Sequence, residues 1–324
     1  MTVLVTGAGG QLGRDLVDVL SGRVPVGGRR AGSGAPVDVV GADHAGLDVA
    51  SRDAVLSVME ALRPAVVVHC AAWTAVDACE ADPDRAFAVN ALGTRHVAEG
   101  ARRVGAHLVY VSTDYVFDGT APDPYREWDR TNPLSVYGRS KLAGEEALDP
   151  TSTVVRTSWV CGAHGANMVK TVLRLAEGTG PLRFVEDQRG CPTFTADLAS
   201  TVALLGRERL PGTFHVTNTG ATSWYGFAGA VLAAAGHDAG RVHPIATAEL
   251  DPPRPAPRPA NSVLDNAALR LMGMDLLPDW RDGLERLVAA LGPGDVAPPG
   301  APPVAAARTG AAGAGPPRSS KEAP

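Results

Sequence analysis

Close to its N-terminus the chain reads Val3-Leu4-Val5-Thr6-Gly7-Ala8-Gly9-Gly10-Gln11-Leu12-Gly13. An apolar run typical of a buried strand leads directly into glycines, and an amphipathic stretch typical of a helix follows. Gly7, Gly10 and Gly13 form the pattern G-x-x-G-x-x-G. Glycines at this spacing allow a tight turn, a close approach of the backbone to a pyrophosphate, and close packing of the helix on the strand. Because the pattern lies between a strand and a helix, it predicts a dinucleotide-binding site.

The same alternation of strand and helix continues along the first half of the chain. Predicted strands cover residues 3–6, 37–41, 65–71, 107–113 and 153–160, and predicted helices cover residues 11–20, 54–62, 84–104 and 137–147. Alternation at this spacing indicates βαβ units, and therefore an α/β fold with a Rossmann-type, doubly wound parallel sheet. Residues 21–36 are rich in glycine, arginine and proline and are expected to form a surface loop.

The alternation becomes less regular after residue 160. Further helices are predicted at residues 167–178, 196–207, 223–235 and 280–291, with strands at 182–185 and 212–216. We expect an NAD(P)-binding domain over residues 1–160, with a later contribution near 190–216, and mainly a smaller substrate-binding lobe over 161–292. Residues 293–324 are mostly proline, glycine and alanine and contain no aromatic residue. A segment of this composition cannot bury enough apolar surface to order itself, so it is expected to be a disordered tail.

The composition excludes several classes of protein. A net charge of −5 over 324 residues argues against nucleic acid or an anionic membrane as the main partner. No apolar run is long enough for a membrane span, and the N-terminus lacks the features of a signal peptide. Four widely spaced cysteines are expected to be reduced thiols, the histidines show no metal-binding spacing, and His69 reads as a core residue. We therefore expect a cytoplasmic protein without a metal site.

A second motif carries acid–base chemistry. Tyr137 and Lys141 form Y-x-x-x-K in a predicted helix, where a spacing of four places both side chains on one face. With five tyrosines and three lysines in the chain, chance predicts about 0.05 such pairs. An ammonium beside a phenol would bring its pKa toward neutrality, as a proton donor requires. Thr113 ends a predicted strand, where its hydroxyl can contact a substrate carbonyl.

The sequence leaves the choice of cofactor between NADPH and NADH open. Asp43 and Asp48 follow the predicted second strand, where an acidic side chain favours a free ribose 2′-hydroxyl. Arg29 and Arg30, in the preceding loop, could instead contact the 2′-phosphate of NADP.

These motifs together resemble the extended short-chain dehydrogenase/reductase superfamily. The resemblance rests on residues 7–13, Asn90-Ala91-Leu92-Gly93-Thr94, Ser112-Thr113-Asp114 and residues 137–141. Within that superfamily the chain is similar to the dTDP-4-dehydrorhamnose reductase family, in residues 71–77, 112–119, 136–145, 156–160, 187–193, 258–262 and 277–280. The similarity runs from residue 1 to about residue 291 and leaves out residues 21–36.

The resemblance implies reduction of the C4 ketone of a dTDP-4-keto-6-deoxyhexose by NADPH or NADH. It implies cofactor contacts for Gly10, Gln11, Leu12, Asp48, Ala71 and Ala72, and substrate contacts for Thr113, Asp114, Trp159 and Arg258. Tyr137 would donate the proton, and Lys141 would hold the nicotinamide ribose. The implied partner is a sugar nucleotide, bound by a monomer or a homodimer.

Two departures from the family stand out. Trp73 occupies a position that is usually histidine in the family. Some members hold magnesium at a dimer interface through two acidic residues. Asp15 matches the first of these, but Ala196 stands at the second, and the neighbouring Asp197 is a weak substitute.

Other functions remain open at this point. A sugar-nucleotide dehydratase would need a second acid after Asp114, where this chain has Tyr115. A different sugar-nucleotide 4-ketoreductase, or an epimerase that keeps its cofactor bound, would use the same catalytic residues. Some relatives of this fold bind NADP as non-catalytic regulatory subunits, for example of methionine adenosyltransferase.

Overall fold

A parallel six-stranded sheet forms the centre of the molecule. The computed structural model describes residues 1–23, 37–292 and 295, so the predicted tail and most of the predicted loop lie outside the described residues. The strand order is β10-β5-β4-β3-β1-β2. The strands are β1 (Thr2–Thr6), β2 (Asp38–Ala42), β3 (Val66–His69), β4 (His107–Thr113), β5 (Thr153–Thr157) and β10 (Gly212–His215). Because all neighbouring pairs run parallel, the predicted Rossmann-type α/β fold is confirmed.

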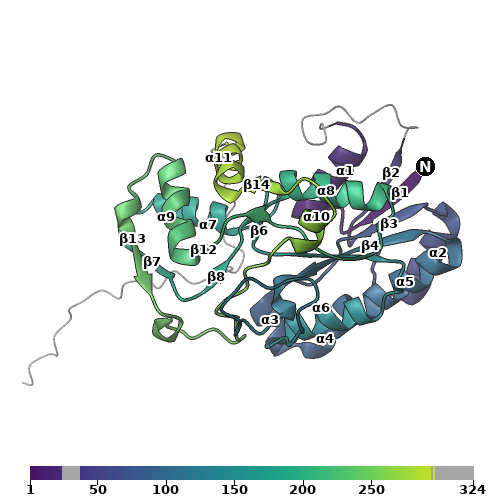
Figure 1. Ribbon diagram of the computed structural model, residues 1–324, viewed down its shortest axis with the longest axis horizontal. Helices are drawn as coiled ribbons and strands as arrows, with labels where there is room; N and C mark the ends of the chain where they lie inside the picture. The colour runs from purple at the N-terminus through teal and green to yellow at the C-terminus, as the bar shows by residue number, and fades with distance from the viewer. Residues whose placement is uncertain (24–36, 293–294, 296–324) are drawn as a thin grey trace, which may run out of the picture.

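Helices cover both faces of this sheet (Figure 1). One face carries α1 (Gln11–Leu20) and α8 (Thr195–Arg207), and the other carries α2 (Arg52–Leu62), α5 (Gly93–Val104) and α6 (Val136–Glu146). The alternation of β1 explains this, since Val3 and Val5 are buried in one core and Leu4 in the other.

The long helix predicted at residues 84–104 is interrupted. It comprises α4 (Pro83–Phe87), a π-helical turn η1 (Ala88–Leu92) and α5. The buried Asn90 lies within η1, and its side-chain amide donates to Ser140 Oγ at 2.9 Å and to the carbonyl of Trp73 at 3.1 Å. Such π turns often occur at functional sites. A further short helix, α3 (Val76–Ala81), was not predicted from the sequence.

The strand predicted at residues 153–160 is also divided. β5 ends at Thr157, and β6 (Val160–Cys161) pairs with β9 (Thr193–Phe194). Between them Trp159 has a φ of 46°, a left-handed conformation that is strained for a side chain of this size. The turn at Trp159 therefore directs the chain from the sheet into a second lobe.

The second lobe lies beside the carboxyl ends of the parallel strands (Figure 1). Its helices are α7 (Met168–Ala176), α9 (Trp224–Ala234) and α11 (Trp280–Ala290), and its parallel strands are β7 (Leu182–Val185) and β13 (Val242–Ile245). Phe184, Phe227 and Trp280 are fully buried in its core. The remaining elements are η2 (Asp114–Val116), β8 (Arg189–Gly190), β11 (Asn218–Thr219), β12 (Thr222–Ser223), η3 (Ala239–Arg241), η4 (Thr247–Glu249), α10 (Ala267–Leu271) and β14 (Leu277–Asp279).

Candidate active site

A cavity of about 420 Å³ opens where the carboxyl ends of β1, β4 and β5 face the second lobe. It is lined by twelve of the fourteen residues predicted from the sequence: Gly7, Gly10, Gln11, Leu12, Gly13, Ala72, Thr113, Asp114, Tyr137, Lys141, Trp159 and Arg258. Ala71 lies just behind the lining, and Asp48 lies apart from it, exposed on the surface. The fold thus brings together residues as far apart in the sequence as Gly7 and Arg258.

The glycine turn accepts no larger side chain at two positions. A Cβ on Gly7, whose φ is 69°, would lie 2.7 Å from the amide nitrogen of Ala71. A Cβ on Gly13 would lie 2.2 Å from the carbonyl oxygen of Gly7. Gly10 precedes the first residue of α1, and no side chain caps this helix end. Its free amides fit the diphosphate of a dinucleotide.

The side chain of Gln11 connects this turn to the second lobe. Its Oε1 accepts from the backbone amide of Gly162 at 3.1 Å and from Asn167 Nδ2 at 3.0 Å, and its Nε2 donates to the carbonyl of Ala166 at 3.2 Å. Asn167 also caps α7 by accepting from the amide of Lys170. Gln11 therefore links the start of α1 to the start of α7.

Tyr137, Thr113 and Asp114 lie together in the cavity wall. Tyr137 and Thr113 are hydrogen-bonded through their hydroxyl groups, and Thr113 also donates to Asp114 Oδ1 at 3.0 Å. The second carboxylate oxygen of Asp114 is buried and has no partner among the protein atoms. Burial raises the pKa of Asp114 to about 6. Because Asp114 lines the cavity, a hydroxyl of a bound ligand is a suitable partner for this carboxylate.

The structure corrects one expectation about Lys141. We expected its ammonium to bring the pKa of Tyr137 toward neutrality, but burial raises the pKa of Tyr137 instead. Lys141 Nζ donates to the carbonyl of Val111 at 2.7 Å and lies 4.1 Å from the centre of the Tyr110 ring. Its own burial lowers the pKa of Lys141 to about 7. Tyr137 is therefore protonated, as the donor in a reduction must be.

Two tryptophans from different lobes form one wall. Trp159 stacks on Trp224, the first residue of α9, with ring centres 3.4 Å apart and planes 5° apart. Gly190 lies against the indole of Trp159, where a Cβ would come within 2.4 Å of Cε2. The strained backbone of Trp159 is thus held by close packing on its side chain.

Arg258 lines the cavity from the segment between η4 and α10. Its guanidinium donates to both carboxylate oxygens of Asp77, at 2.9 and 2.8 Å, and its side chain is only 6% exposed. Arg254 also contacts Asp77, at 3.3 Å. Burial alone would raise the pKa of Asp77, but the two arginines and the backbone amide of Ala256 outweigh burial and hold that pKa below its usual value. The pair fixes a cation at the mouth of the site.

Two opposite charges flank Gly9 in the glycine turn. Arg14 Nε donates to the carbonyl of Gly9 at 3.3 Å, and a Cβ on Gly9 would lie 3.2 Å from Asp43 Cβ. Asp43 follows β2, and its Oδ1 accepts from the amides of Ala45 and Gly46. Asp48 is the acceptor for the amide of Ala50 in the next turn. Arg29 and Arg30 lie outside the described residues.

The side chains considered for magnesium have other partners. Asp197 accepts from Arg286 at 2.7 Å and from Asn218 at 2.8 Å, and Asp15 lies 3.8 Å from His164 Nε2. The described part of the chain holds no group of three histidine, cysteine, aspartate or glutamate side chains that could bind a metal ion. His69 is a satisfied core residue, as predicted, because Thr6 and Thr94 contact its two ring nitrogens.

Residues 1–292 match the model of the RmlD substrate binding domain family. The chain belongs to this family. A dTDP-4-dehydrorhamnose reductase of Streptomyces griseus is 45% identical over 297 residues, which cover 89% of this chain and 93% of the relative. A probable dTDP-4,6-dihydroxy-2-methyloxan-3-one 4-ketoreductase of Streptomyces antibioticus is 43% identical and covers 88% of this chain and 93% of its own length.

A solved structure of an RmlD-family relative holds a cofactor. The dTDP-4-dehydrorhamnose reductase of Bacillus anthracis, in complex with NADP, is 38% identical with a TM-score of 0.82, and the alignment covers 90% of this chain and 99% of that one. The sequence-based assignment of the family is therefore confirmed.

Among the lining residues of this RmlD-family site that were not predicted from the sequence are Asn167 and Trp224. Both are at the start of second-lobe helices, and no motif marks them as site residues. Trp73, which departs from the family pattern, does not line the cavity, and the guanidinium of Arg85 lies 4.5 Å from its ring centre.

Proposed function

We propose that the protein reduces the C4 ketone of a dTDP-4-keto-6-deoxyhexose with NADPH or NADH, converting dTDP-4-dehydro-L-rhamnose to dTDP-L-rhamnose. The observation that carries this proposal is the hydrogen-bonded pair of Thr113 and Tyr137 in a cavity continuous with the glycine turn. The name and bound NADP of the Bacillus anthracis relative support the same reaction and cofactor class.

The side chains of the cavity divide the work of the reduction. A bound nicotinamide cofactor supplies the hydride to C4. Tyr137 donates its phenolic proton to the carbonyl oxygen, and the hydroxyl of Thr113 hydrogen-bonds the same oxygen as negative charge develops on it. Lys141 holds the nicotinamide ribose, and Gly7, Gly10, Gln11, Leu12 and Gly13 hold the diphosphate end of the cofactor, with Ala71, Ala72 and Asp48 at its other contacts.

The sugar nucleotide would occupy the side of the cavity nearest the second lobe. Arg258 supports this placement as a buried cation that can pair with the substrate diphosphate. The unpartnered oxygen of Asp114 can accept from a sugar hydroxyl, and Trp159 presents a flat apolar face to the sugar ring.

A different dTDP-linked keto-sugar is the second candidate substrate. The Streptomyces antibioticus relative, named for another ketoreductase substrate, is 43% identical, close to the 45% of the Streptomyces griseus relative. A dehydratase is disfavoured because it would need an acid directly after Asp114. This chain has Tyr115 there, which is hydrogen-bonded to Arg258 and supplies no carboxylate. An epimerase would keep NAD bound through purification.

Purified protein tests the proposal directly. We would follow NADPH and NADH oxidation at 340 nm with enzymatically generated dTDP-4-dehydro-L-rhamnose, and identify the product by mass spectrometry and NMR. Turnover that depends on Tyr137 is the expected result. A folded protein that binds NADPH but turns over neither this substrate nor related dTDP-4-keto-sugars would overturn the proposal and favour a regulatory subunit.

We also propose that residues 1–160 together with the chain near 190–216 form the cofactor domain, and that residues 161–292 mainly form the substrate lobe. Separate apolar cores in the sheet and in the second lobe support this division. We further propose that the protein is a monomer or a homodimer and that it has no nucleic-acid partner. A cytoplasmic location is supported by the four free cysteines, which fit a reducing compartment. Among the described residues no helix is long and apolar enough to cross a bilayer. Light scattering coupled to size exclusion measures the assembly.

A further inference from the structure

A buried ion pair lies one helical turn beyond the proposed catalytic pair. Tyr137, Lys141 and Glu145 are spaced four apart on α6 and therefore follow one another along one face. Glu145 accepts from Arg156 Nη2 at 2.7 Å and from Arg156 Nε at 3.0 and 3.2 Å. The two side chains are only 8% and 7% exposed.

Successive residues of β4 contact this face of α6. The carbonyl of Val111 accepts from Lys141 at 2.7 Å, the hydroxyl of Ser112 donates to Glu145 Oε1 at 2.5 Å, and Thr113 is hydrogen-bonded to Tyr137. Glu145 thus belongs to the same strand–helix contact that places the proposed catalytic side chains.

Stability does not explain why charges are buried here. A buried ion pair stabilises a fold little more than apolar residues of the same size would, because both charges lose their hydration. Arg156 lies on β5 of the sheet, and Glu145 lies on α6, which packs against β4. The position of Glu145 one turn along α6 from Lys141 points to an effect on that side chain.

Few other groups can influence the charge of Lys141. Burial is the main cause that lowers its pKa, and the carboxylate of Glu145 is the main cause that raises it, followed by Cys70. Tyr110 presents only its ring face, and His69 is neutral at physiological pH because burial and Lys141 lower its pKa to about 3. Glu145 is therefore the one carboxylate among the groups that shift Lys141 in the described chain.

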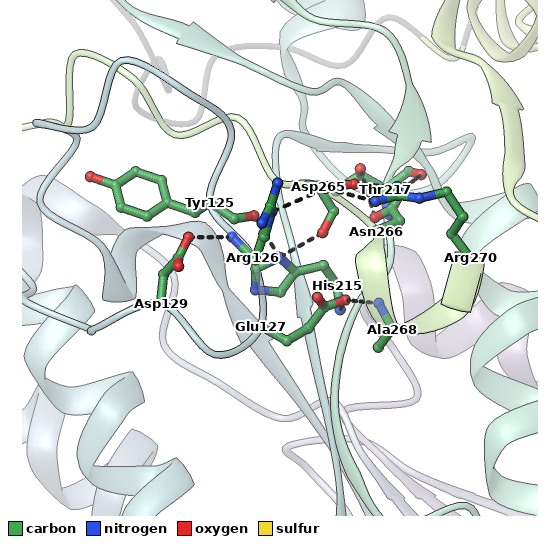
Figure 2. A network of polar contacts seen from close by, with 10 residues as sticks. All are labelled: Tyr125, Arg126, Glu127, Asp129, His215, Thr217, Asp265, Asn266, Ala268 and Arg270. Carbon is green, nitrogen blue, oxygen red and sulfur yellow. Dashed lines mark hydrogen bonds and ion pairs between the residues drawn. The ribbon is translucent and has the colours of Figure 1, made fainter. Parts of the chain in front are cut away.

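Arg156 is held in place from its far side. Its Nη1 donates to the carbonyl of Glu127 at 3.3 Å, and its guanidinium lies 5.2 Å from the ring centre of Phe117. Glu127 belongs to the polar network of Figure 2, where its carboxylate accepts from the backbone amides of His215 and Ala268. The cation cannot turn away from Glu145 without breaking these contacts.

From this arrangement we propose that Glu145 is a positioning residue that keeps Lys141 in its charged form, while Arg156 limits how strongly it does so. The inference rests on the proposed function, because that function requires a cationic Lys141 at the nicotinamide ribose. Because the two side chains carry opposite charges, removing one or the other should shift the pKa of Lys141 in opposite directions, and this gives the proposal a signature that a structural role lacks.

Direct titration of Lys141 tests the proposal without cofactor or substrate. The chain has only three lysines, Lys141, Lys170 and Lys321, so lysine labelled with ¹³C at Cε gives a simple NMR spectrum, and Lys141→Arg assigns the signal. Glu145→Gln keeps an acceptor for Ser112 but removes the charge, and it should lower the pKa of Lys141 by about one unit. Arg156→Met should raise that pKa.

The double variant Glu145→Gln with Arg156→Met is the matched control. It removes both charges and should bring the Lys141 titration back toward an intermediate value, and thermal melting reports whether each variant is folded. In the turnover assay, Glu145→Gln should lose about tenfold in kcat at pH 8 and recover most of it near pH 6.

The outcomes separate this inference from the proposed function. Opposite shifts of the Lys141 titration in the two single variants support it. An unmoved titration, or an equal loss of activity at every pH in Glu145→Gln, would overturn it and leave the ion pair a purely structural role. Absence of turnover in the wild-type protein would instead count against the proposed function, since the NMR titration is independent of it.

Discussion

Gln11 and Asn167, separated by 156 positions in the sequence, are joined by a hydrogen bond of 3.0 Å from Asn167 Nδ2 to Gln11 Oε1. The first residue begins the helix that follows the glycine turn, and the second caps the first helix of the second lobe. This bond places the cofactor end of the cavity in direct contact with the lobe proposed to bind the sugar nucleotide.

Loss of the Gln11 side chain should therefore affect the sugar nucleotide more than the cofactor. Gln11→Ala removes the contacts to residues 162–167 but keeps the backbone amides of the turn. We expect KM for the sugar nucleotide to rise about tenfold, with a smaller change in the Kd of NADPH measured by fluorescence. Asn167→Ala should act similarly and non-additively in a double-mutant cycle. Additive effects, or a change confined to NADPH, would contradict this linkage.

Tyr137→Phe should remove the proton donor with little change in shape. The ring keeps its edge contact with Tyr115 at 5.7 Å between ring centres. We expect kcat to fall about 10²- to 10⁴-fold while the Kd of NADPH stays the same. Tyr225→Phe, a change in α9 away from the cavity lining, is the control and should retain activity. A Tyr137→Phe protein with normal kcat would assign the proton to another group.

Gly190→Ala should disturb the tryptophan wall without touching the substrate. Its Cβ would come within 2.4 Å of the Trp159 indole, which must then shift from its place in the cavity wall. A displacement of this kind near the reacting groups is expected to lower kcat/KM about 100-fold. Gly229→Ala, where nothing lies within 4 Å of the new Cβ, provides the matched control. Equal kinetics for both variants would show that Trp159 has no part in seating the sugar.

Arg14 and Asp43 should have opposite effects on the choice of cofactor, because they flank Gly9 with opposite charges. Arg14→Ala should raise KM for NADPH about tenfold relative to NADH, since it removes a cation available to the 2′-phosphate. Asp43→Asn should shift the preference toward NADPH. Steady-state kinetics with both cofactors measure the ratio. A ratio that moves the same way in both variants would exclude this assignment.

The buried histidines should make the fold sensitive to acid. Burial lowers the pKa of His69 and of His215 to about 3, compared with 6.5 for an unperturbed histidine. The unfolded chain therefore binds these protons first, and stability present above pH 6.5 is lost as the pH falls toward 3. Each histidine contributes a slope of about 1.4 kcal/mol per pH unit in that window.

Urea denaturation between pH 7 and pH 4 measures this effect. His215→Asn should reduce the dependence of the free energy of unfolding on pH by the share of one histidine. His237→Asn, at an exposed position, serves as the control. An unchanged slope in His215→Asn would mean that this histidine takes up its proton without unfolding the protein.

Local patterns were enough to predict the parts of the site that lie on one strand and the next helix. The glycines at 7, 10 and 13 and the pair Tyr137 and Lys141 each occur within one short segment, and the parallel sheet brings their segments together. Asn167 and Trp224 could not be found in this way. They reach the cavity only through the packing of the second lobe, and nothing in their immediate sequence records that packing.

Two predictions were wrong in detail, the unbroken strand across Trp159 and the lowered pKa of Tyr137, because both depend on tertiary packing. The strand predicted across Trp159 is broken because this residue has a positive φ. A glycine at this position would have indicated such a conformation in the sequence, but a tryptophan does not. The pKa of Tyr137 depends on how deeply the fold buries it, and a helical spacing of four predicts a shared face but not the direction in which Lys141 points.

The place of β10 in the sheet has a consequence for protein engineering. The chain leaves the sheet after β5 and forms β6, α7, β7, β8 and β9. It then returns through α8, and β10 pairs with β5 before the chain leaves the sheet a second time. A fragment cut at residue 160 would expose the edge of β5 and lose α8, one of the two helices that cover one face. A chimera made to change substrate preference must therefore exchange two separate inserts, on either side of α8 and β10, and keep the returning strand with its host.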